Sequence, residues 1–244
     1  MMKDQVKEIL EKYRKSEKFQ RPPPPYSLLP QFIDHTLLKP EAREEDIIRL
    51  CREAIKVKFY SVCVHPCWVP LAKKELGETG VQLVTVVGFP LGANSWETKL
   101  EEALWCLKQG VNEIDMVMNI GFLKSGHYKA CADEIKKIVD RTGIPIKVII
   151  ETCLLSEEEK VLAAMIVAEA GAAFIKTSTG FSTGGASAED VRLLRFAAQE
   201  KYKVKASGGI RTLAQTIEMI QAGADRIGTS SGLKILEEAK GTPV

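Results

Sequence analysis

The chain has 244 residues, 45% of them hydrophobic and 27% charged, and its 34 lysines and arginines nearly balance its 32 aspartates and glutamates. This composition is typical of a folded globular protein and excludes the disordered, collagen-like and disulfide-scaffold classes. A formal net charge of +2 provides no basic field for a nucleic-acid backbone, so we expect a small-molecule ligand and no nucleic acid.

The six cysteines are scattered, mostly inside apolar runs, as buried thiols in a reducing compartment would be. The first 15 residues carry charges every few positions and lack the apolar core of a secretory signal, and no later stretch is long and apolar enough to span a membrane. We therefore expect a cytoplasmic protein with no membrane partner.

Residues 1–30 differ in pattern from the rest of the chain. Apolar residues recur at helical spacing on a charged background at Val6, Ile9, Leu10 and Tyr13, and a run of four prolines, Pro22 to Pro25, then favours an extended linker. We expect a short helix that docks on the domain surface or on a neighbouring subunit. A separate functional module is the alternative.

From residue 31 to residue 244 one pattern repeats: a short β-branched run, a turn, then an amphipathic helix. The apolar runs are residues 31–38, 59–65, 81–88, 112–118, 145–152, 172–178, 202–209 and 224–230. Helical stretches between them include 44–57, 95–110, 126–143, 156–171, 187–201 and 212–223, several with Ser or Thr at the start and Gly at the end. Eight such units predict an α/β fold, a closed (β/α)₈ TIM barrel, as the catalytic domain. An open doubly wound sheet is the alternative, although no dinucleotide glycine fingerprint follows the first strand.

In such barrels the chemistry lies at the carboxyl ends of the strands, so a charge late in an apolar strand is a candidate site residue. Lys176 follows Ala172, Ala173, Phe174 and Ile175. Apolar surroundings lower the pKa of an amine and leave more of the neutral form, which attacks carbonyl groups. A lysine that extends its amine to solvent, or half of an interior ion pair, is the structural alternative.

Lys205 occupies the matching position in the next strand. If both lysines point inward, repulsion between the two ammonium groups lowers the pKa of at least one of them and activates it for Schiff-base formation. Lys203 lies two residues earlier and shares the face of Lys205 in an ideal strand, so a surface position for both remains open.

Asp115 is the acid within a run of Ile, Met and Val. It is either a counter-ion and proton carrier between substrate and water, or part of a structural ion pair. Asp34, Lys147 and Glu151 have the same character, and we assign them to an interior polar network that supports the site.

The last two strands end in glycine-rich turns, SGGIRT (207–212) and IGTSSG (227–232). Loops after the seventh and eighth strands of these barrels commonly bind phosphate, through backbone N–H groups and a helix N-terminus. We therefore expect a phosphorylated substrate. The candidate ligands, including the turn after Lys176, are Thr179, Gly180, Gly208, Gly209, Arg211, Ser230 and Ser231.

Cys63, His65 and Cys67 form a CVHPC motif, but structural zinc requires four ligands, and no second pair stands nearby. We expect no metal and no other cofactor, and we place Cys63 near the mouth of the active site. His35 and His127 have no visible triad partner and are expected in core or surface roles.

Six motifs together resemble the deoxyribose-phosphate aldolase family of class I aldolases, in order and at the expected separations from about residue 30 onward. They are FIDHTLL (32–38), GFPLG (88–92), EIDMVMN (113–119), FIKTSTGF (174–181), KASGGIRT (205–212) and IGTSSG (227–232). The resemblance implies that Lys176 forms the Schiff base, that Lys205 lowers the pKa of that lysine and transfers protons, and that Asp115 belongs to the proton relay. Some members carry a phosphate-binding lysine directly after TSTG, where this chain has Phe181.

The activity implied is the reversible cleavage of 2-deoxy-D-ribose 5-phosphate to D-glyceraldehyde 3-phosphate and acetaldehyde. The resemblance also implies a homodimer or homotetramer. Two alternatives remain: another Schiff-base aldolase that acts on a different phosphosugar, and a non-catalytic phosphosugar-binding barrel.

Overall fold

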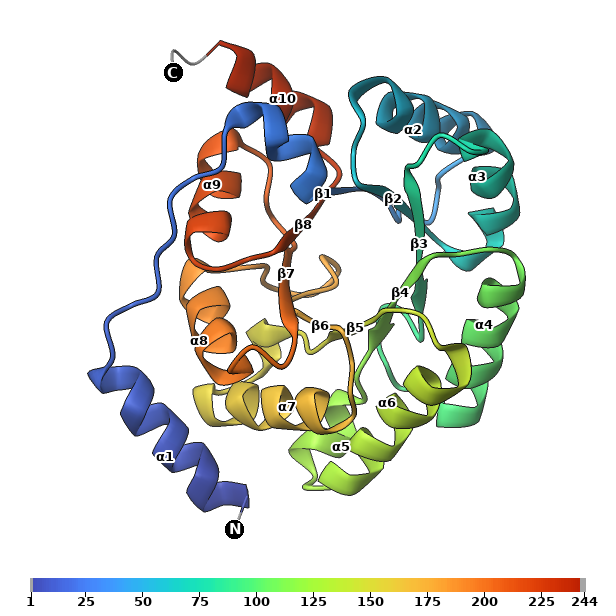
Figure 1. Cartoon of the computed structure of the whole chain (residues 1–244). Coiled ribbons are helices and arrows are strands. Elements are labelled where there is room, and N and C mark those ends of the chain that lie inside the picture. Colours follow the sequence, from blue (N-terminus) through green and yellow to red (C-terminus); the bar gives the residue numbers. More distant parts are fainter. Residues whose placement is uncertain (1, 242–244) are drawn as a thin grey trace.

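The computed structural model describes residues 2–241, and its centre is a closed barrel of parallel strands (Figure 1). The strands are β1 (Ile33–Leu37), β2 (Ser61–Val64), β3 (Gln82–Val87), β4 (Glu113–Val117), β5 (Ile146–Ile149), β6 (Phe174–Lys176), β7 (Lys203–Ser207) and β8 (Arg226–Thr229). Each pairs with the next, and β8 closes the barrel on β1. The predicted (β/α)₈ barrel is confirmed, and the open-sheet alternative is wrong because its sheet would leave two edges unpaired.

Helices surround the barrel as an outer layer. They are α2 (Glu44–Val57), α3 (Val69–Leu76), α4 (Trp96–Lys108), α5 (Ile120–Lys124), α6 (Tyr128–Thr142), α7 (Glu157–Glu169), α8 (Ala188–Ala198), α9 (Leu213–Gln221) and α10 (Gly232–Lys240). Short 3₁₀ helices span Tyr26–Phe32 (η1), Pro66–Trp68 (η2) and Thr152–Leu154 (η3). Side chains of Ser95, Ser156, Ser187 and Thr212 accept N–H bonds at four helix starts, as the capping pattern predicts.

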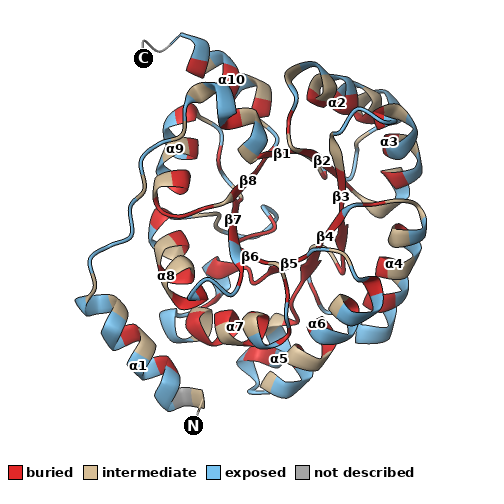
Figure 2. Cartoon of the chain, in the orientation of Figure 1, coloured by how far each residue is buried: buried red, intermediate tan, exposed pale blue. Residues whose placement is uncertain are grey.

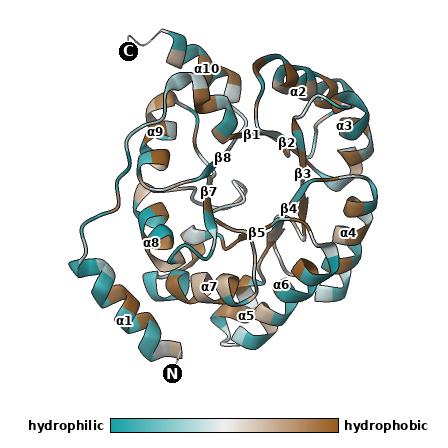
Figure 3. Ribbon diagram, in the orientation of Figure 1, coloured by the Kyte–Doolittle hydropathy of each residue, from teal (hydrophilic) through white to brown (hydrophobic). Residues whose placement is uncertain are grey.

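The main hydrophobic core lies between the strands and the helices. Figure 2 shows buried residues along the strands and on the helix faces turned toward them, and Figure 3 shows the helices divided into hydrophobic and hydrophilic faces. Fully buried members such as Ile47, Leu83, Ile114 and Ile175 contribute roughly 1.5–3 kcal/mol each by leaving water. The opposite faces of the strands point into the barrel, because side chains alternate along a strand.

The barrel interior is mostly polar, with one small apolar cluster of Leu38, Cys63, Val84 and Val86 against Phe89. Strand register brings specific charged residues together there. Asp115 on β4 is paired with Lys147 on β5, and Lys176 on β6 is paired with Lys205 on β7. The fold therefore carries the candidate residues into a single interior space.

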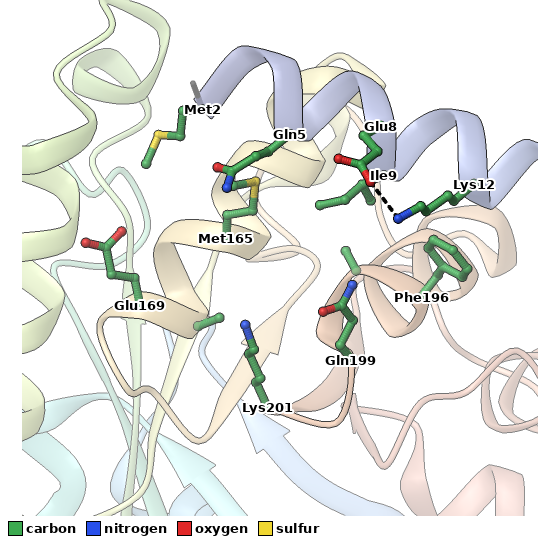
Figure 4. A pocket seen from close by; sticks show the side chains of 12 residues that line it. Met2, Gln5, Glu8, Ile9, Lys12, Met165, Glu169, Phe196, Gln199 and Lys201 are labelled. Atoms are coloured by element: carbon green, nitrogen blue, oxygen red, sulfur yellow. Dashed lines mark hydrogen bonds and ion pairs between the residues drawn. The ribbon is translucent and has the colours of Figure 1, made fainter.

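Helix α1 (Met2–Lys15) lies outside the barrel, beside α7 and α8 (Figure 1). Val6 and Leu10 are buried, and the ring of Tyr13 packs 5.4 Å from that of Phe196. A cavity of about 630 Å³ remains beneath α1, where Met2 and Ile9 lie across from Met165 and Phe196 (Figure 4). The amphipathic helix is thus seated on the chain's own barrel through its apolar face.

An extended segment connects α1 to η1 along the outside of α9 (Figure 1). Arg21 ties this segment down, since its backbone N–H donates to Gln221 O at 3.1 Å and its Nε donates to Ile220 O at 2.8 Å. None of the helices in the described part of the chain combines the length and the hydrophobicity that crossing a membrane requires.

Candidate active site

A cavity of about 340 Å³ opens at the carboxyl ends of four strands, β1, β6, β7 and β8. Its wall is formed by Thr36 to Lys39, Lys176, Thr179 to Phe181, Ser207 to Arg211, and Gly228 to Ser230. This is the end at which barrel enzymes carry their chemistry. The cavity joins Lys176 directly to the glycine-rich turns that the sequence predicts as the phosphate site.

Lys176 ends β6 and is only 3% exposed. Its Nζ donates to Asp115 Oδ2 at 2.8 Å. Burial lowers the pKa of Lys176, the Asp115 carboxylate opposes this effect, and the Lys205 ammonium lowers the pKa further. The net shift is downward, so the environment favours the neutral amine.

Lys205 is fully buried and donates from Nζ to Asp115 Oδ2 at 2.7 Å and to Asp34 Oδ2. Burial disfavours its charge, but the two carboxylates outweigh burial and raise the pKa of Lys205. The pKa values of the two lysines are therefore shifted in opposite directions. Lys203, by contrast, begins β7 and is exposed, so the surface position left open for both residues applies to Lys203 alone.

Asp115 lies at the centre of these contacts and is fully buried. Its Oδ1 accepts from Lys147 Nζ at 2.7 Å, while Oδ2 accepts from both Lys176 and Lys205. Burial disfavours the carboxylate, but the three lysines reverse this effect and hold the pKa of Asp115 well below its usual value. The same balance lowers the pKa of Asp34 through its pairing with Lys205 and Arg226.

The structure brings Asp34 and Lys147 into this interior group, as the sequence analysis expects, but it places Glu151 elsewhere. Glu151 has φ +50°, which turns the chain out of the β5 direction, and its carboxylate accepts from the Thr179 N–H at 3.3 Å and from the Thr179 hydroxyl. The interior-network assignment is therefore corrected for Glu151, which holds the turn after Lys176. Because Glu151 occupies both Thr179 donors, Thr179 lines the cavity as support for that turn and has neither donor left for phosphate.

Glycine is required where the turns after β6 and β7 meet. Gly208 has φ +91°, and a side chain at Gly185 would place its Cβ 2.3 Å from Gly208 O. The Ala186 N–H donates to that same oxygen at 3.0 Å, which locks the two turns together. Gly180, Gly209, Arg211 and Ser230 are exposed and line the cavity. Ser231 lies one residue farther along as the N-cap residue of α10, and its N–H donates to Thr229 Oγ1 at 2.9 Å.

Phe181 stands half exposed on the rim and meets Phe89 edge-to-face, with ring centroids 5.3 Å apart. Phe89 in turn packs against His65 at 5.7 Å. An aromatic wall of Phe181, Phe89 and His65 therefore stands on the rim beside Gly180, at the position where some family members are expected to carry a cation.

The CVHPC motif is divided between environments. Cys63 is buried in the barrel, where burial and Asp115 raise the pKa of its thiol to about 11, whereas Cys67 is exposed. The His65 Nε2 donates to Leu38 O at 2.9 Å. Over residues 2–241 no three His, Cys, Asp or Glu side chains gather as ligands of a metal ion would.

Neither remaining histidine belongs to the cavity. His35 is buried, 2.8 Å from Glu53 and against the Phe59 ring, and His127 packs on Phe122 next to α6. Core and surface positions were expected for these two residues.

Glu113 and Arg226 are buried charges of the barrel interior that were not predicted from the sequence, and they contact each other at 3.3 Å. Both are charged residues that begin apolar strands, and Glu113 precedes Asp115 by two positions, so it shares the inward face. Position in the strand was the missing signal, because only late-strand charges were considered. Lys39 was also missed, since it lies in the loop after β1 and not in a strand.

The chain is similar to proteins of one family. The family of DeoC/LacD family aldolases matches this chain over residues 29–238. A deoxyribose-phosphate aldolase from Caldanaerobacter subterraneus subsp. tengcongensis is 53% identical over 214 residues, covering 86% of this chain and 93% of the relative. The crystal structure of a putative deoxyribose-phosphate aldolase from Coccidioides immitis has a TM-score of 0.92 at 34% identity and covers 98% of both chains. A deoxyribose-phosphate aldolase from Aeropyrum pernix, described as a unique tetrameric structure, has a TM-score of 0.82 at 36% identity and covers 96% of this chain and 98% of that one.

Proposed function

The chain belongs to the DeoC/LacD aldolase family and has deoxyribose-phosphate aldolase activity, and we propose that it carries out this lyase reaction through a Schiff base on Lys176. The observation that supports Lys176 is its position. It is the buried lysine with a lowered pKa that also lines the cavity at the carboxyl ends of the strands.

The reaction begins when the neutral Nζ of Lys176 attacks the C1 aldehyde carbon of 2-deoxy-D-ribose 5-phosphate. Protonation of the hydroxyl group of the carbinolamine lets that group leave as water, and a protonated imine remains. The positively charged imine then withdraws electrons from the neighbouring carbon atoms. The charge of Lys205 disfavours a second ammonium beside it, so it promotes the neutral form of Lys176 before the attack.

Cleavage breaks the C2–C3 bond after a base removes the C3 hydroxyl proton. The bonding electrons move toward the imine and form an enamine, and D-glyceraldehyde 3-phosphate leaves. Protonation of the enamine carbon and hydrolysis of the imine then release acetaldehyde. We assign the proton transfers to Asp115, Lys205 and water, because Asp115 Oδ2 lies within 2.8 Å of the nitrogen atoms of both lysines.

The substrate phosphate is proposed to bind at the other end of the cavity. Gly209 and Ser230 are exposed there at the turns after β7 and β8, close to the start of α10. Backbone N–H groups at a helix start attract an anion, and the Arg211 side chain adds a charge at the rim. Gly180 and Gly208 allow the turns after β6 and β7 to approach each other closely.

Borohydride reduction in the presence of acetaldehyde tests the proposal. An ethyl group on Lys176, located by mass spectrometry of peptides, is the expected result. The Lys176→Leu variant should lose this adduct and retain less than a few per cent of the activity. The control is Lys203→Leu, which replaces the exposed lysine of β7 and should keep both the adduct and the activity. An unlabelled Lys176 would favour a non-catalytic sugar-binding barrel. An adduct without formation of deoxyribose 5-phosphate from acetaldehyde would favour another phosphosugar aldolase.

We also propose that residues 31–244 form the catalytic domain, that the chain forms a homo-oligomer and that it works in the cytoplasm. The tetrameric Aeropyrum pernix relative supports the oligomer. All six cysteines are free thiols, which supports a reducing compartment.

A further inference from the structure

Six charged side chains from five strands form a closed ring of alternating charge inside the barrel. We call this the interior ring. In order around it are Arg226 (β8), Asp34 (β1), Lys205 (β7), Asp115 (β4), Lys147 (β5) and Glu113 (β4). No member has a side chain more than 7% exposed.

The half of the ring away from the cavity is closed by Arg226 and Glu113. Arg226 Nη1 lies 2.8 Å from Asp34 Oδ1 and 3.3 Å from Glu113 Oε2. Lys147 Nζ then connects Glu113 Oε2 to Asp115 Oδ1, at 2.7 Å from each. Arg226 also stacks 3.4 Å above the Tyr60 ring, and the Tyr60 hydroxyl donates to Glu113.

Lys176 is attached to this ring but is not a member of it. Its ion pair is with Asp115 Oδ2, an oxygen that Lys205 already contacts at 2.7 Å. Each cation of the ring contacts two carboxylates, whereas Lys176 shares one oxygen of one carboxylate. Among these four cations, the charge of Lys176 is therefore the least compensated.

Lys176 is also the residue that upsets the balance of formal charge in the barrel interior. The ring holds three acids and three bases and is neutral when all six are ionised, so Lys176 would add one uncompensated positive charge to a buried site. Burying an unpaired charge costs far more than burying a paired one. The surplus proton is lost at least cost from Lys176.

We propose that Glu113 and Arg226 are positioning residues that make Lys176 the neutral amine of the site, by completing a charge-balanced ring that keeps Lys205 cationic. This inference rests on the proposed function, because it concerns the same Schiff-base lysine. Neither residue lines the cavity, so both act through the ring and not on the substrate.

The other groups around Lys176 are consistent with control by the ring. Cys63, from β2, faces the same space, but its raised pKa of about 11 keeps the thiol neutral at physiological pH. Glu151 is engaged by Thr179 in the turn after β6. Lys39 and Arg211 line the cavity from exposed positions, where solvent screens their charges.

The two ends of the Arg226–Glu113 contact should have opposite effects. Arg226→Gln removes a cation and leaves the ring with a surplus of negative charge, so Lys176 should keep its proton to higher pH. The acid limb of the kcat/KM profile should shift to higher pH by roughly one unit. At pH values within this limb kcat/KM should be about tenfold lower, and at higher pH it should change little. Glu113→Gln removes an anion and should move the limb to lower pH. The double variant should return it toward the original position.

The experiment measures two quantities against pH on the full chain: kcat/KM, and the rate at which Lys176 is trapped with acetaldehyde and borohydride. Arg226→Lys conserves the charge, so the acid limb should lie at the same pH as in the unmodified chain. Asp190→Asn, in the partly buried Lys160–Asp190 pair between α7 and α8, is the matched acid-to-amide control and should leave the limb in place.

The inference would be overturned if the acid limb of kcat/KM moved in the same direction in both single variants or did not move at all. A purely structural role does not predict pH shifts in opposite directions for the two variants. Each single variant predicts its own direction, so one that folds is sufficient if the other does not. Failure to trap Lys176 in the unmodified chain would instead refute the proposed function. Trapping of Lys176 with unchanged limbs would refute the ring alone.

Discussion

Lys176 and Lys205 are register partners on β6 and β7, and the nitrogen atoms of both lie within 2.8 Å of the same oxygen, Asp115 Oδ2. Two ammonium groups cannot both be compensated by one oxygen at little cost. Asp34 provides a second carboxylate to Lys205 only, and this asymmetry separates the pKa values of the two lysines.

The asymmetry makes Lys205 a direct test. Lys205→Met removes the like charge beside Lys176 and the second donor to Asp115 Oδ2, so Lys176 should have that oxygen to itself and retain its proton. We expect kcat/KM at neutral pH to fall by roughly 10²- to 10⁴-fold, with partial recovery at alkaline pH. Steady-state kinetics from pH 6 to pH 10 measure this. A uniform loss at all pH values would contradict the electrostatic role.

Asp115→Asn should affect both stability and rate. Removing the carboxylate leaves Lys147, Lys176 and Lys205 without their shared partner, and breaking a buried ion pair costs about 3–5 kcal/mol. Urea denaturation measures the loss in the free energy of unfolding, and kcat should fall with it. Native stability with normal kcat would show that this carboxylate has neither role.

Acid should unfold the protein in a predictable range. The pKa values of Asp34 and Asp115 lie below the ordinary value of an aspartate in the folded state, so an unfolded chain binds protons at these sites first as pH falls. Their stabilisation is fully present above about pH 5 and is lost as pH decreases through 4 and below. Urea midpoints between pH 3 and pH 7 should show this decline, and Asp34→Asn should flatten it.

Phe181→Lys tests the phosphate end of the cavity. Phe181 is half exposed and lines the cavity, so a lysine there can reach solvent and approach a bound phosphate. We expect a several-fold lower KM for deoxyribose 5-phosphate, and a smaller decrease in KM at high salt. The KM for unphosphorylated 2-deoxyribose should not decrease. Phe181→Met is the control for the lost contact with Phe89, and an equal gain in that variant would argue against a charge effect.

Deletion of residues 1–25 tests the N-terminal extension. Val6 and Leu10 bury apolar surface against the barrel, so the deletion should lower the thermal midpoint by several degrees. We also expect the assembly to change in sedimentation velocity if α1 supports an interface. An unchanged sedimentation pattern would show that α1 does not contribute to the assembly, whether or not the thermal midpoint falls.

Much of the fold and of the candidate site could be predicted from the sequence. Eight repeats of strand and helix indicate a barrel, and side-chain alternation with parallel pairing directs late-strand charges to one interior, which identified Lys176, Lys205 and Asp115. These inferences depend on local periodicity and on general rules for parallel strands, so the sequence carries them by itself.

Pairing across the barrel was decided only by the tertiary structure. The stagger of the strands determines which oxygen each lysine contacts, brings Arg226 to Glu113 across 113 positions of chain and leaves Lys203 outside while Lys205 is buried. A left-handed backbone at Glu151 took that carboxylate away from the ring and toward Thr179. Such contacts depend on ångström-scale distances between segments far apart in the chain, which hydrophobic pattern and local propensity do not encode.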